Sequence, residues 1–212
     1  MSLKLHVFPP SPRAFKVQAA ANHLGLDYEL CFVNLAKGDQ KRPEHLAINP
    51  NGKMPVLEED GFALWESNAI LNYLAAKKPG SGLLPLDERG RADVMRWLFW
   101  DSAHWDAACA ILVFEHLVKP MFGRGGADPV EVAKGEERFQ QCAKVLDALL
   151  KGRKFICGDK LTLADFSIGA SLILAEQAKL PLVPYAEIKR WYAGLTALPC
   201  WQKTLAGIAA AG

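Results

Sequence analysis

The sequence predicts two domains, an α/β domain in residues 1–79 and an all-helical domain in residues 87–212. Three observations carry this prediction. Segments with the residue pattern of β-strands occur only before residue 66. Pro79-Gly80-Ser81-Gly82 is the clearest linker in the chain, and the composition changes there. Beyond that linker we find helical periodicity and no convincing strand.

The α/β domain begins with a strand, a helix and a second strand. Lys4 to Phe8 alternate between polar and apolar residues, which predicts a strand. Arg13 to Leu24 have apolar residues at helical spacing, and Pro12 suits the first turn of that helix. Tyr28 to Val33 form a second strand. Because a helix joins the two strands, we expect them to be parallel.

A turn and a hairpin follow within the segment NPNGKMPVLEEDGFALWES, residues 49–67. A looser segment, 36–43, and a short helix, 44–48, lead to the turn at 49–52, where Asn, Pro and Gly are typical turn residues. A proline after a tight turn can be cis, so we expect a cis Met54-Pro55 bond. Asp60-Gly61 predicts a hairpin between two short strands.

The remaining segments are predicted to be helical. A helix starts at Glu66-Ser67 and runs to Lys77. Residues 87–119 form one long helical stretch, in which a kink is an alternative to a straight helix, and residues 129–150 form a second helix. Thr162 and Asp165 are spaced as a capping box at the start of the next helix. Residues 188–198 and 201–210 supply the last two helices.

Composition excludes several classes of function. The formal net charge is +2 and the basic residues are dispersed, so we expect no nucleic-acid binding. No apolar run has the length of a membrane span, and no signal core follows the N-terminus. The five cysteines form no CxxC or Cys/His cluster, which argues against a disulfide scaffold, a metal site or a thioredoxin-type redox motif. We expect buried core thiols and a cytoplasmic protein.

The start of the helix at Ser67 is a candidate site for a small ligand. Backbone amides at a helix N-terminus, beside a turn that exposes the Met54 backbone, can bind a carboxylate. Glu66 can hold an ammonium group at the same place. A ligand with both an α-amino and an α-carboxyl group would fit this pair, although ordinary turn and cap chemistry explains the same residues.

The same segment resembles the glutathione-binding half of the glutathione transferases. The matching residues are NPxGKxPVLxxDxFxLxES followed by NAILxYL, and GDKLTLADFSIGASL resembles the capping box and buried helix of the same superfamily. The element order βαβαββα is that of a thioredoxin-like domain. The resemblance covers nearly the whole chain. It implies a thioredoxin-like α/β domain followed by an all-α helical domain, and a homodimer.

The resemblance implies a serine-type site like that of the phi and theta classes. In such enzymes a serine after the first strand stabilises the glutathione thiolate, and Ser11 in PPSPRAFKV has that place. From the residues alone, Ser11 is expected to be a plain helix cap, and the resemblance reverses that expectation. Ala14 departs from the family pattern, in which a hydroxyl residue is common. Arg13 is therefore a secondary candidate for the activating group.

The resemblance also implies which residues bind the rest of glutathione. Lys41 and Lys53 would approach the glycine carboxylate, with Gln40 in place of the family's histidine. The Met54 backbone, before Pro55, would pair with the cysteinyl part. Glu66 and Ser67 would hold the γ-glutamyl group. Solvated loop charge is the alternative for Lys41.

Aromatic residues between Arg96 and Phe114 mark a candidate pocket for the second substrate. Asp101 and His104 are three residues apart, which in an α-helix places them on one face with Trp97. A packed core, with a half-buried His104, is the alternative. The candidate electrophile-site residues are Pro12, Arg13, Leu35, Asp101, His104, Trp105 and Phe114.

The predicted function is transfer of the glutathione thiolate to a small apolar electrophile, a detoxification reaction. Glutathione is a co-substrate, and no metal is implied. A glutathione-dependent peroxidase or disulfide reductase of the same fold is an alternative, although this class prefers a cysteine near position 11. The other alternative is a non-catalytic binding module, against which the set of Lys53, Glu66 and Ser67 argues.

Overall fold

The computed structural model of the chain describes residues 3–211, which divide into two units. The first unit contains the residues up to Leu84 together with those from Ala197 onward. The second unit contains Pro85–Thr196. This division differs from the sequence prediction, which assigned the last helix to the helical domain.

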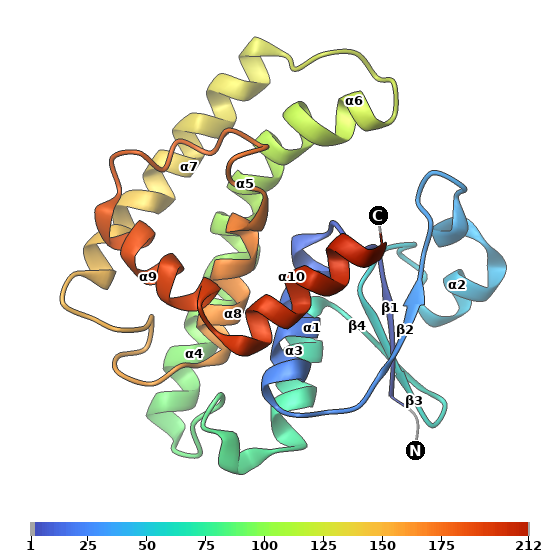
Figure 1. Cartoon of the computed structure of the whole chain (residues 1–212), viewed down its shortest axis with the longest axis horizontal. Coiled ribbons are helices and arrows are strands. Elements are labelled where there is room, and N and C mark those ends of the chain that lie inside the picture. The colour runs from blue at the N-terminus through green and yellow to red at the C-terminus, as the bar shows by residue number, and fades with distance from the viewer. Residues whose placement is uncertain (1–2, 212) are drawn as a thin grey trace. The chain divides into compact units, whose positions relative to one another are not determined.

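A four-stranded mixed sheet forms the centre of the first unit (Figure 1). Its strands are β1 (Leu3–Val7), β2 (Glu29–Phe32), β3 (Val56–Glu59) and β4 (Phe62–Trp65), in the order β2-β1-β3-β4. β1 and β2 are parallel, whereas β1 pairs with β3, and β3 with β4, in antiparallel fashion. The predicted βαβ unit and hairpin are confirmed, and the domain is thioredoxin-like.

Helices cover both faces of this sheet. α1 (Pro12–His23) and α3 (Ser67–Ala76) lie together on one side, and α2 (Pro43–Ile48) lies on the other (Figure 1). The alternation along β1 explains the arrangement, because Leu5 and Val7 are fully buried while His6 points to the opposite face. The His6 ring contacts the ring of His45 from α2, with 6.4 Å between centroids.

The C-terminal helix α10 (Pro199–Ala211) packs on α1. Trp201 is fully buried, and its ring lies 4.7 Å from the ring of Phe15. The Asn22 side-chain amide donates to Thr204 Oγ1 at 2.9 Å, and that hydroxyl donates to the Cys200 carbonyl at 2.8 Å. These contacts make α10 part of the first unit. Helical periodicity in the sequence does not reveal which domain a helix packs against.

Helices and the loops between them make up the second unit in the described part of the chain, apart from one isolated β-bridge between Phe155 and Gly158. Its helices are α4 (Glu88–Trp100), α5 (Asp106–Val113), α6 (Lys119–Met121), α7 (Pro129–Leu150), α8 (Leu163–Ala170) and α9 (Ala186–Thr196). The predicted long helix is interrupted twice by π-helical turns, at Asp101–Trp105 and Phe114–Val118. Within residues 3–211, every helix is too short or too polar to cross a membrane.

The capping box at the start of α8 is confirmed and has further partners. Asp165 Oδ2 accepts from the backbone N–H of Thr162 at 2.9 Å and from its hydroxyl at 3.1 Å. Asp165 Oδ1 accepts from Ile156 N–H and Trp191 Nε1, both at 2.9 Å. Burial raises the pKa of Asp165, and the four donors act in the opposite direction. One carboxylate thus joins α8, α9 and the loop before them.

Because Trp201 fills the contact between α10 and α1, we predict that Trp201→Ala lowers the free energy of unfolding by about 3–5 kcal/mol. Urea unfolding measures this loss. Trp65→Ala is the matched control in the same unit, because Trp65 is 39% exposed, and its loss should be much smaller. Equal losses in the two variants would contradict the assignment of α10 to the core of the first unit.

Candidate functional site

Ser11 caps α1 at the end of the short turn that follows β1. Its backbone is extended (φ −73°, ψ 122°), and its own N–H donates to the Phe8 carbonyl at 2.9 Å. Ser11 Oγ accepts from the N–H of Ala14 at 3.4 Å, which is a long hydrogen bond. A hydroxyl has one donor and two acceptor positions, so this cap uses an acceptor only. The Ser11 proton therefore stays available to an anion, and the cap and the anion-binding role are compatible.

The turn before β3 is built around the side chain of Asn49, which is buried. Its Nδ2 donates to the Lys53 carbonyl at 2.8 Å, and its Oδ1 accepts from the N–H of Asn51 at 3.0 Å. The ring Nε2 of His45 also donates to the Lys53 carbonyl, at 3.1 Å. Sequence reasoning missed both residues as parts of the site. The turn sequence indicated a turn, but nothing in it shows which side chains close it.

Gly52 brings the loop at residues 39–41 against this turn. Gly52 has φ +59°, and a Cβ at this position would lie 3.0 Å from the Gln40 carbonyl oxygen. Gln40 and Lys41 belong to a 3₁₀ turn, Asp39–Lys41. Because the two backbones touch, Lys41 and Lys53 extend from adjacent loops, and both are exposed. Two ammonium groups on adjacent loops can bind a carboxylate.

The peptide bond between Met54 and Pro55 is cis, as the sequence predicted. Pro55 is buried at the entry to β3, and Met54 is half-buried. The N–H of Met54 donates to no acceptor within residues 3–211. It is a free backbone donor between the Lys53 loop and the sheet.

The start of α3 presents the other polar groups of the site. Glu66 has φ 68° and ψ 110°, an uncommon backbone conformation for a residue other than glycine. Such conformations gather at ligand-binding positions. Ser67 is the first residue of α3 and is buried. In the described part of the chain, neither the Glu66 carboxylate nor the Ser67 hydroxyl has a hydrogen-bond or ion-pair partner.

A buried lysine connects this helix start to α1. Lys16 is 3% exposed, and its Nζ donates to Asn68 Oδ1 at 2.7 Å. Asn68 follows Ser67 in the first turn of α3. The contact holds the helix that begins after Ser11 against the helix that begins at Ser67. The sequence gives no signal for this pairing, because Lys16 has the spacing of an ordinary helical lysine.

The predicted electrophile-site residues have different environments. In the first unit, Pro12 and Leu35 are half-buried and Arg13 is exposed. In the second unit, His104 and Phe114 are exposed.

Asp101 and Trp105 lie in the core of the second unit instead of on an accessible surface. Both are fully buried. Asp101 Oδ2 accepts from the Ser167 hydroxyl at 2.5 Å, and Trp105 Nε1 donates to the Ile168 carbonyl at 3.0 Å. These two residues hold α8 against the long helix.

The prediction that Asp101 and His104 share one helix face is wrong. Residues 101–105 form a π-helical turn, in which the hydrogen bonds span five residues instead of four. Three residues then turn through a smaller angle than in an α-helix. As a result, Asp101 points inward, while His104 is exposed and not half-buried.

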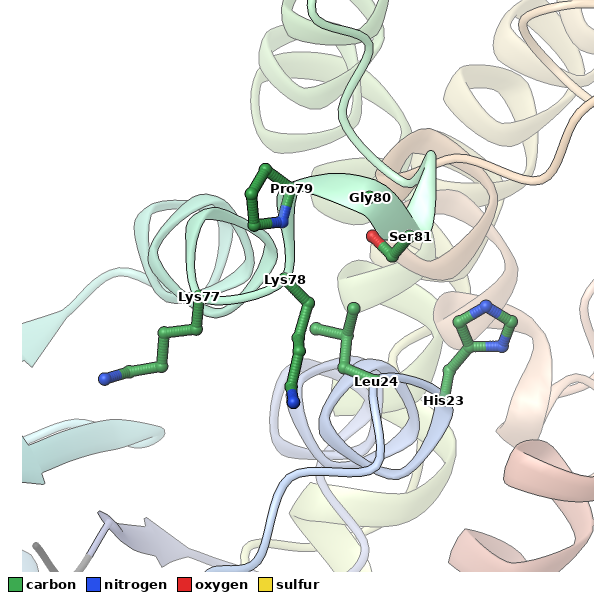
Figure 2. Close-up of a pocket in the computed structure, with 7 residues that line it drawn as sticks. All are labelled: His23, Leu24, Lys77, Lys78, Pro79, Gly80 and Ser81. Atoms are coloured by element: carbon green, nitrogen blue, oxygen red, sulfur yellow. The ribbon is translucent and has the colours of Figure 1, made fainter.

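Three other features of the described residues bear on alternative sites. No group of three or more His, Cys, Asp or Glu residues in the described part of the chain could hold a metal ion. Burial raises the pKa of the Cys31 thiol, which disfavours a reactive thiolate there. A shallow pocket lies at the C-terminal ends of α1 and α3 (Figure 2), and it contains none of the predicted site residues. It is lined by His23, Leu24, Lys77, Lys78, Pro79, Gly80 and Ser81.

Two family models match the chain. Residues 1–76 match the N-terminal domain of glutathione S-transferases, and residues 129–194 match the C-terminal domain. The chain is 36% identical to glutathione S-transferase 3 of Zea mays, over 97% of this chain and 94% of the relative. It is 32% identical to a glutathione S-transferase of Hyoscyamus muticus, over 97% of this chain and 98% of the relative.

Solved structures of similar proteins have the same fold. The structure of glutathione S-transferase I from maize with an atrazine–glutathione conjugate has a TM-score of 0.87, at 32% identity, with 99% of each chain covered. Glutathione S-transferase I bound to lactoylglutathione has a TM-score of 0.86, at 31% identity, with 97% of this chain and 99% of that chain covered.

We predict that Gly52→Ala destabilises the first unit more than Gly25→Ala does. Both glycines have a left-handed backbone, with φ +59° and +62°, so each alanine costs about 1–2 kcal/mol for the backbone alone. Only the Cβ at position 52 meets another backbone, whereas nothing lies within 4 Å of a Cβ at position 25. Denaturant unfolding of both variants measures the difference. Equal losses would show that the 39–41 loop does not press on the turn.

Proposed function

The chain belongs to the glutathione S-transferase family and is a glutathione transferase, and on this premise we propose that its first unit binds glutathione across the turn at 49–54 and the start of α3. The observation that carries the proposal is the set of unpartnered polar groups at these positions. The Met54 N–H, the Ser67 hydroxyl and the Glu66 carboxylate all lack partners among residues 3–211. Unsatisfied groups gathered on one unit are what a polar ligand requires.

We propose that the γ-glutamyl end of glutathione binds at the start of α3. The free N–H groups and the dipole of a helix N-terminus favour a carboxylate, and the Ser67 hydroxyl adds a donor. The Glu66 carboxylate then accepts from the α-ammonium group of the same ligand residue. The positive φ of Glu66 turns the chain sharply from β4 into α3, so that both residues belong to one tight corner.

We propose that Lys41 and Lys53 bind the glycine carboxylate, with Gln40 beside them. The contact between Gly52 and Gln40 supports this assignment, because it places the two lysines on adjacent loops. Met54 lies between Lys53 and Pro55, and its backbone pairs with the cysteinyl part of glutathione. The ligand thus lies extended along the edge that leads into β3.

We propose that Ser11 activates the glutathione thiol. A hydroxyl that donates to the thiolate favours the charged form and lowers the pKa of the bound thiol. The long hydrogen bond from the Ala14 N–H uses an acceptor position of the same oxygen, so donation to sulfur leaves this capping hydrogen bond in place. The thiolate attacks an electrophilic carbon, a C–S bond forms, and the displaced group leaves with the electron pair. A disulfide reductase of this fold normally prefers a cysteine where this chain has Ser11.

We propose that the electrophile is small and apolar and that Pro12, Arg13 and Leu35 contact it. Pro12 and Arg13 follow Ser11 directly, and Leu35 lies in the loop after β2. The atrazine–glutathione conjugate bound by the maize enzyme supports this class of substrate. The sequence prediction that His104 and Phe114 also belong to the electrophile site stays a prediction.

We further propose a cytoplasmic homodimer. All five cysteines are free in the structure, which suits a reducing compartment.

Large apolar side chains are exposed in both units, among them Phe62 at 47% and Phe99 at 68%, and such side chains are typical of surfaces that a second copy covers. We expect light scattering at micromolar concentration to give twice the mass of the 212-residue chain. A monomer mass would contradict the dimer.

We predict that Glu66→Ala and Ser67→Ala each weaken glutathione binding about tenfold to over a hundredfold. Each variant removes a charge-assisted hydrogen bond, which contributes about 1.5–3 kcal/mol. Isothermal titration calorimetry measures the dissociation constant. Glu88→Ala removes a glutamate in the first turn of α4 and serves as the control. Unchanged affinity in both site variants would show that these residues have only a structural role.

We predict that Ser11→Ala leaves glutathione affinity nearly intact but lowers turnover at neutral pH about ten- to a hundredfold. Without the hydroxyl donor, the pKa of the bound thiol rises, so less thiolate is present at neutral pH. The rate should recover as the pH increases, and the pH–rate profile should shift to higher pH. Ser81→Ala, at an exposed serine, is the control.

A structural role alone for Ser11 predicts a different result. Loss of a helix cap costs about 0.5–2 kcal/mol of stability and leaves the pH–rate profile unshifted. That outcome would transfer the activating role to Arg13 or to a backbone amide.

A further inference from the structure

The carbonyl oxygen of Lys53 is held by two side chains at once. Asn49 Nδ2 donates to it at 2.8 Å and His45 Nε2 at 3.1 Å. Both donors are buried, with 2% exposure for Asn49 and 7% for His45. A carbonyl can only accept, so Nε2 of His45 carries the proton. The two donors come from α2 and from the residue that follows it, so the carbonyl is drawn toward α2.

This carbonyl shares a rigid peptide plane with the N–H of Met54. The peptide bond between Lys53 and Met54 is trans, and the cis bond of this segment is the one between Met54 and Pro55. In a planar trans peptide the C=O and the N–H point in opposite directions. When His45 and Asn49 fix the Lys53 carbonyl toward α2, they also direct the Met54 N–H away from α2. That N–H has no acceptor among residues 3–211.

From this geometry we infer that His45 is a positioning residue for glutathione. Together with Asn49, it sets the plane of the Lys53–Met54 peptide, so that the Met54 N–H donates to the cysteinyl carbonyl of the ligand. This inference rests on the proposed glutathione site. His45 itself does not touch the ligand. It acts through one peptide plane, and it acts in ligand binding and not in the chemical step.

Of the two donors to the Lys53 carbonyl, His45 is the one that can be substituted without disturbing the turn. Asn49 also closes its own turn through Asn51, so its loss would disturb the turn as a whole. His45 reaches the Lys53 carbonyl from outside the turn, from the middle of α2. Its ring also contacts the His6 ring of β1, which holds α2 on the sheet. An aromatic replacement would keep this packing and lose only the hydrogen bond.

The test uses the whole protein and three variants of His45. His45→Phe keeps the ring and removes the donor. His45→Gln places an amide nitrogen the same number of bonds from Cα as Nε2, so it restores the donor. His45→Asn is polar but too short to reach the carbonyl. His116→Phe, at a half-buried histidine of the second unit, controls for exchanging a histidine for a phenylalanine.

Calorimetry with glutathione should show a dissociation constant about three- to tenfold higher for His45→Phe and His45→Asn than for the wild type. The His45→Gln and His116→Phe variants should bind within about twofold of the wild type. Turnover at saturating glutathione should be unchanged in all four variants, so that the effect appears in KM and not in kcat. If His45→Phe does not fold, comparing the glutathione affinities of His45→Gln and His45→Asn tests the role of the hydrogen bond instead.

A second ligand separates this mechanism from an effect on the Lys53 side chain. The glycine monoethyl ester of glutathione lacks the carboxylate that the lysines bind and keeps the cysteinyl carbonyl. If His45 acts through the Met54 N–H, His45→Phe should weaken ester binding by the same factor as glutathione binding. A loss confined to glutathione would overturn the inference, because His45 would then act through the Lys53 ammonium group.

Failure of the inference and failure of the proposed site give different results. Full affinity in His45→Phe, with weakened binding in Glu66→Ala, would overturn the role of His45 and keep the site. Full affinity in both variants would reject the glutathione site itself, and with it the inference. A uniform loss of both affinity and kcat in His45→Phe that Gln does not restore would assign His45 a purely structural role.

Discussion

The first unit depends on how the chain closes the turn before β3. One buried amide, that of Asn49, bonds both ends of this turn, and the Lys53 carbonyl receives a second donor from α2. The closed turn determines where β3 begins and supports the loop at 39–41 through Gly52. Because β3 pairs with β1, the position of this turn is tied to the other inner strand of the sheet. The sheet therefore holds the proposed ligand site on this turn in a fixed position.

The polar groups around Asp165 and those of the candidate site differ in whether they have hydrogen-bond partners. In the second unit, Asp165 has four donors around one carboxylate, and this satisfied network joins three segments of the core. In the first unit, the Met54 N–H and the Ser67 hydroxyl have no partner among the described residues, and Glu66 keeps an uncommon backbone conformation. Unsatisfied groups and an unusual backbone conformation lower stability, and binding of glutathione at the proposed site would compensate for both.

Much of the fold could be predicted because its signals are local. Alternation along β1, the Asp60-Gly61 turn and the Thr162–Asp165 spacing each depend on neighbours in sequence. The prediction failed where a local rule assumed regular geometry. Asp101 and His104 are three residues apart, but a π-helical turn separates their faces. The same turn left Trp105 and Asp101 in the core, where helical spacing had suggested a pocket.

The sequence by itself determined the fold class, the family and the residue types at the candidate site, because these follow from local periodicity, turn chemistry and a motif of adjacent residues. Only the tertiary structure decided what those residues contact. It joined α10 to the first unit through Trp201 and Phe15, and Lys16 to Asn68 across 52 positions. It also drew His45 to the Lys53 carbonyl. The first two contacts depend on packing between elements distant in the chain, and the third depends on how α2 lies against the turn that follows it, which no local pattern encodes.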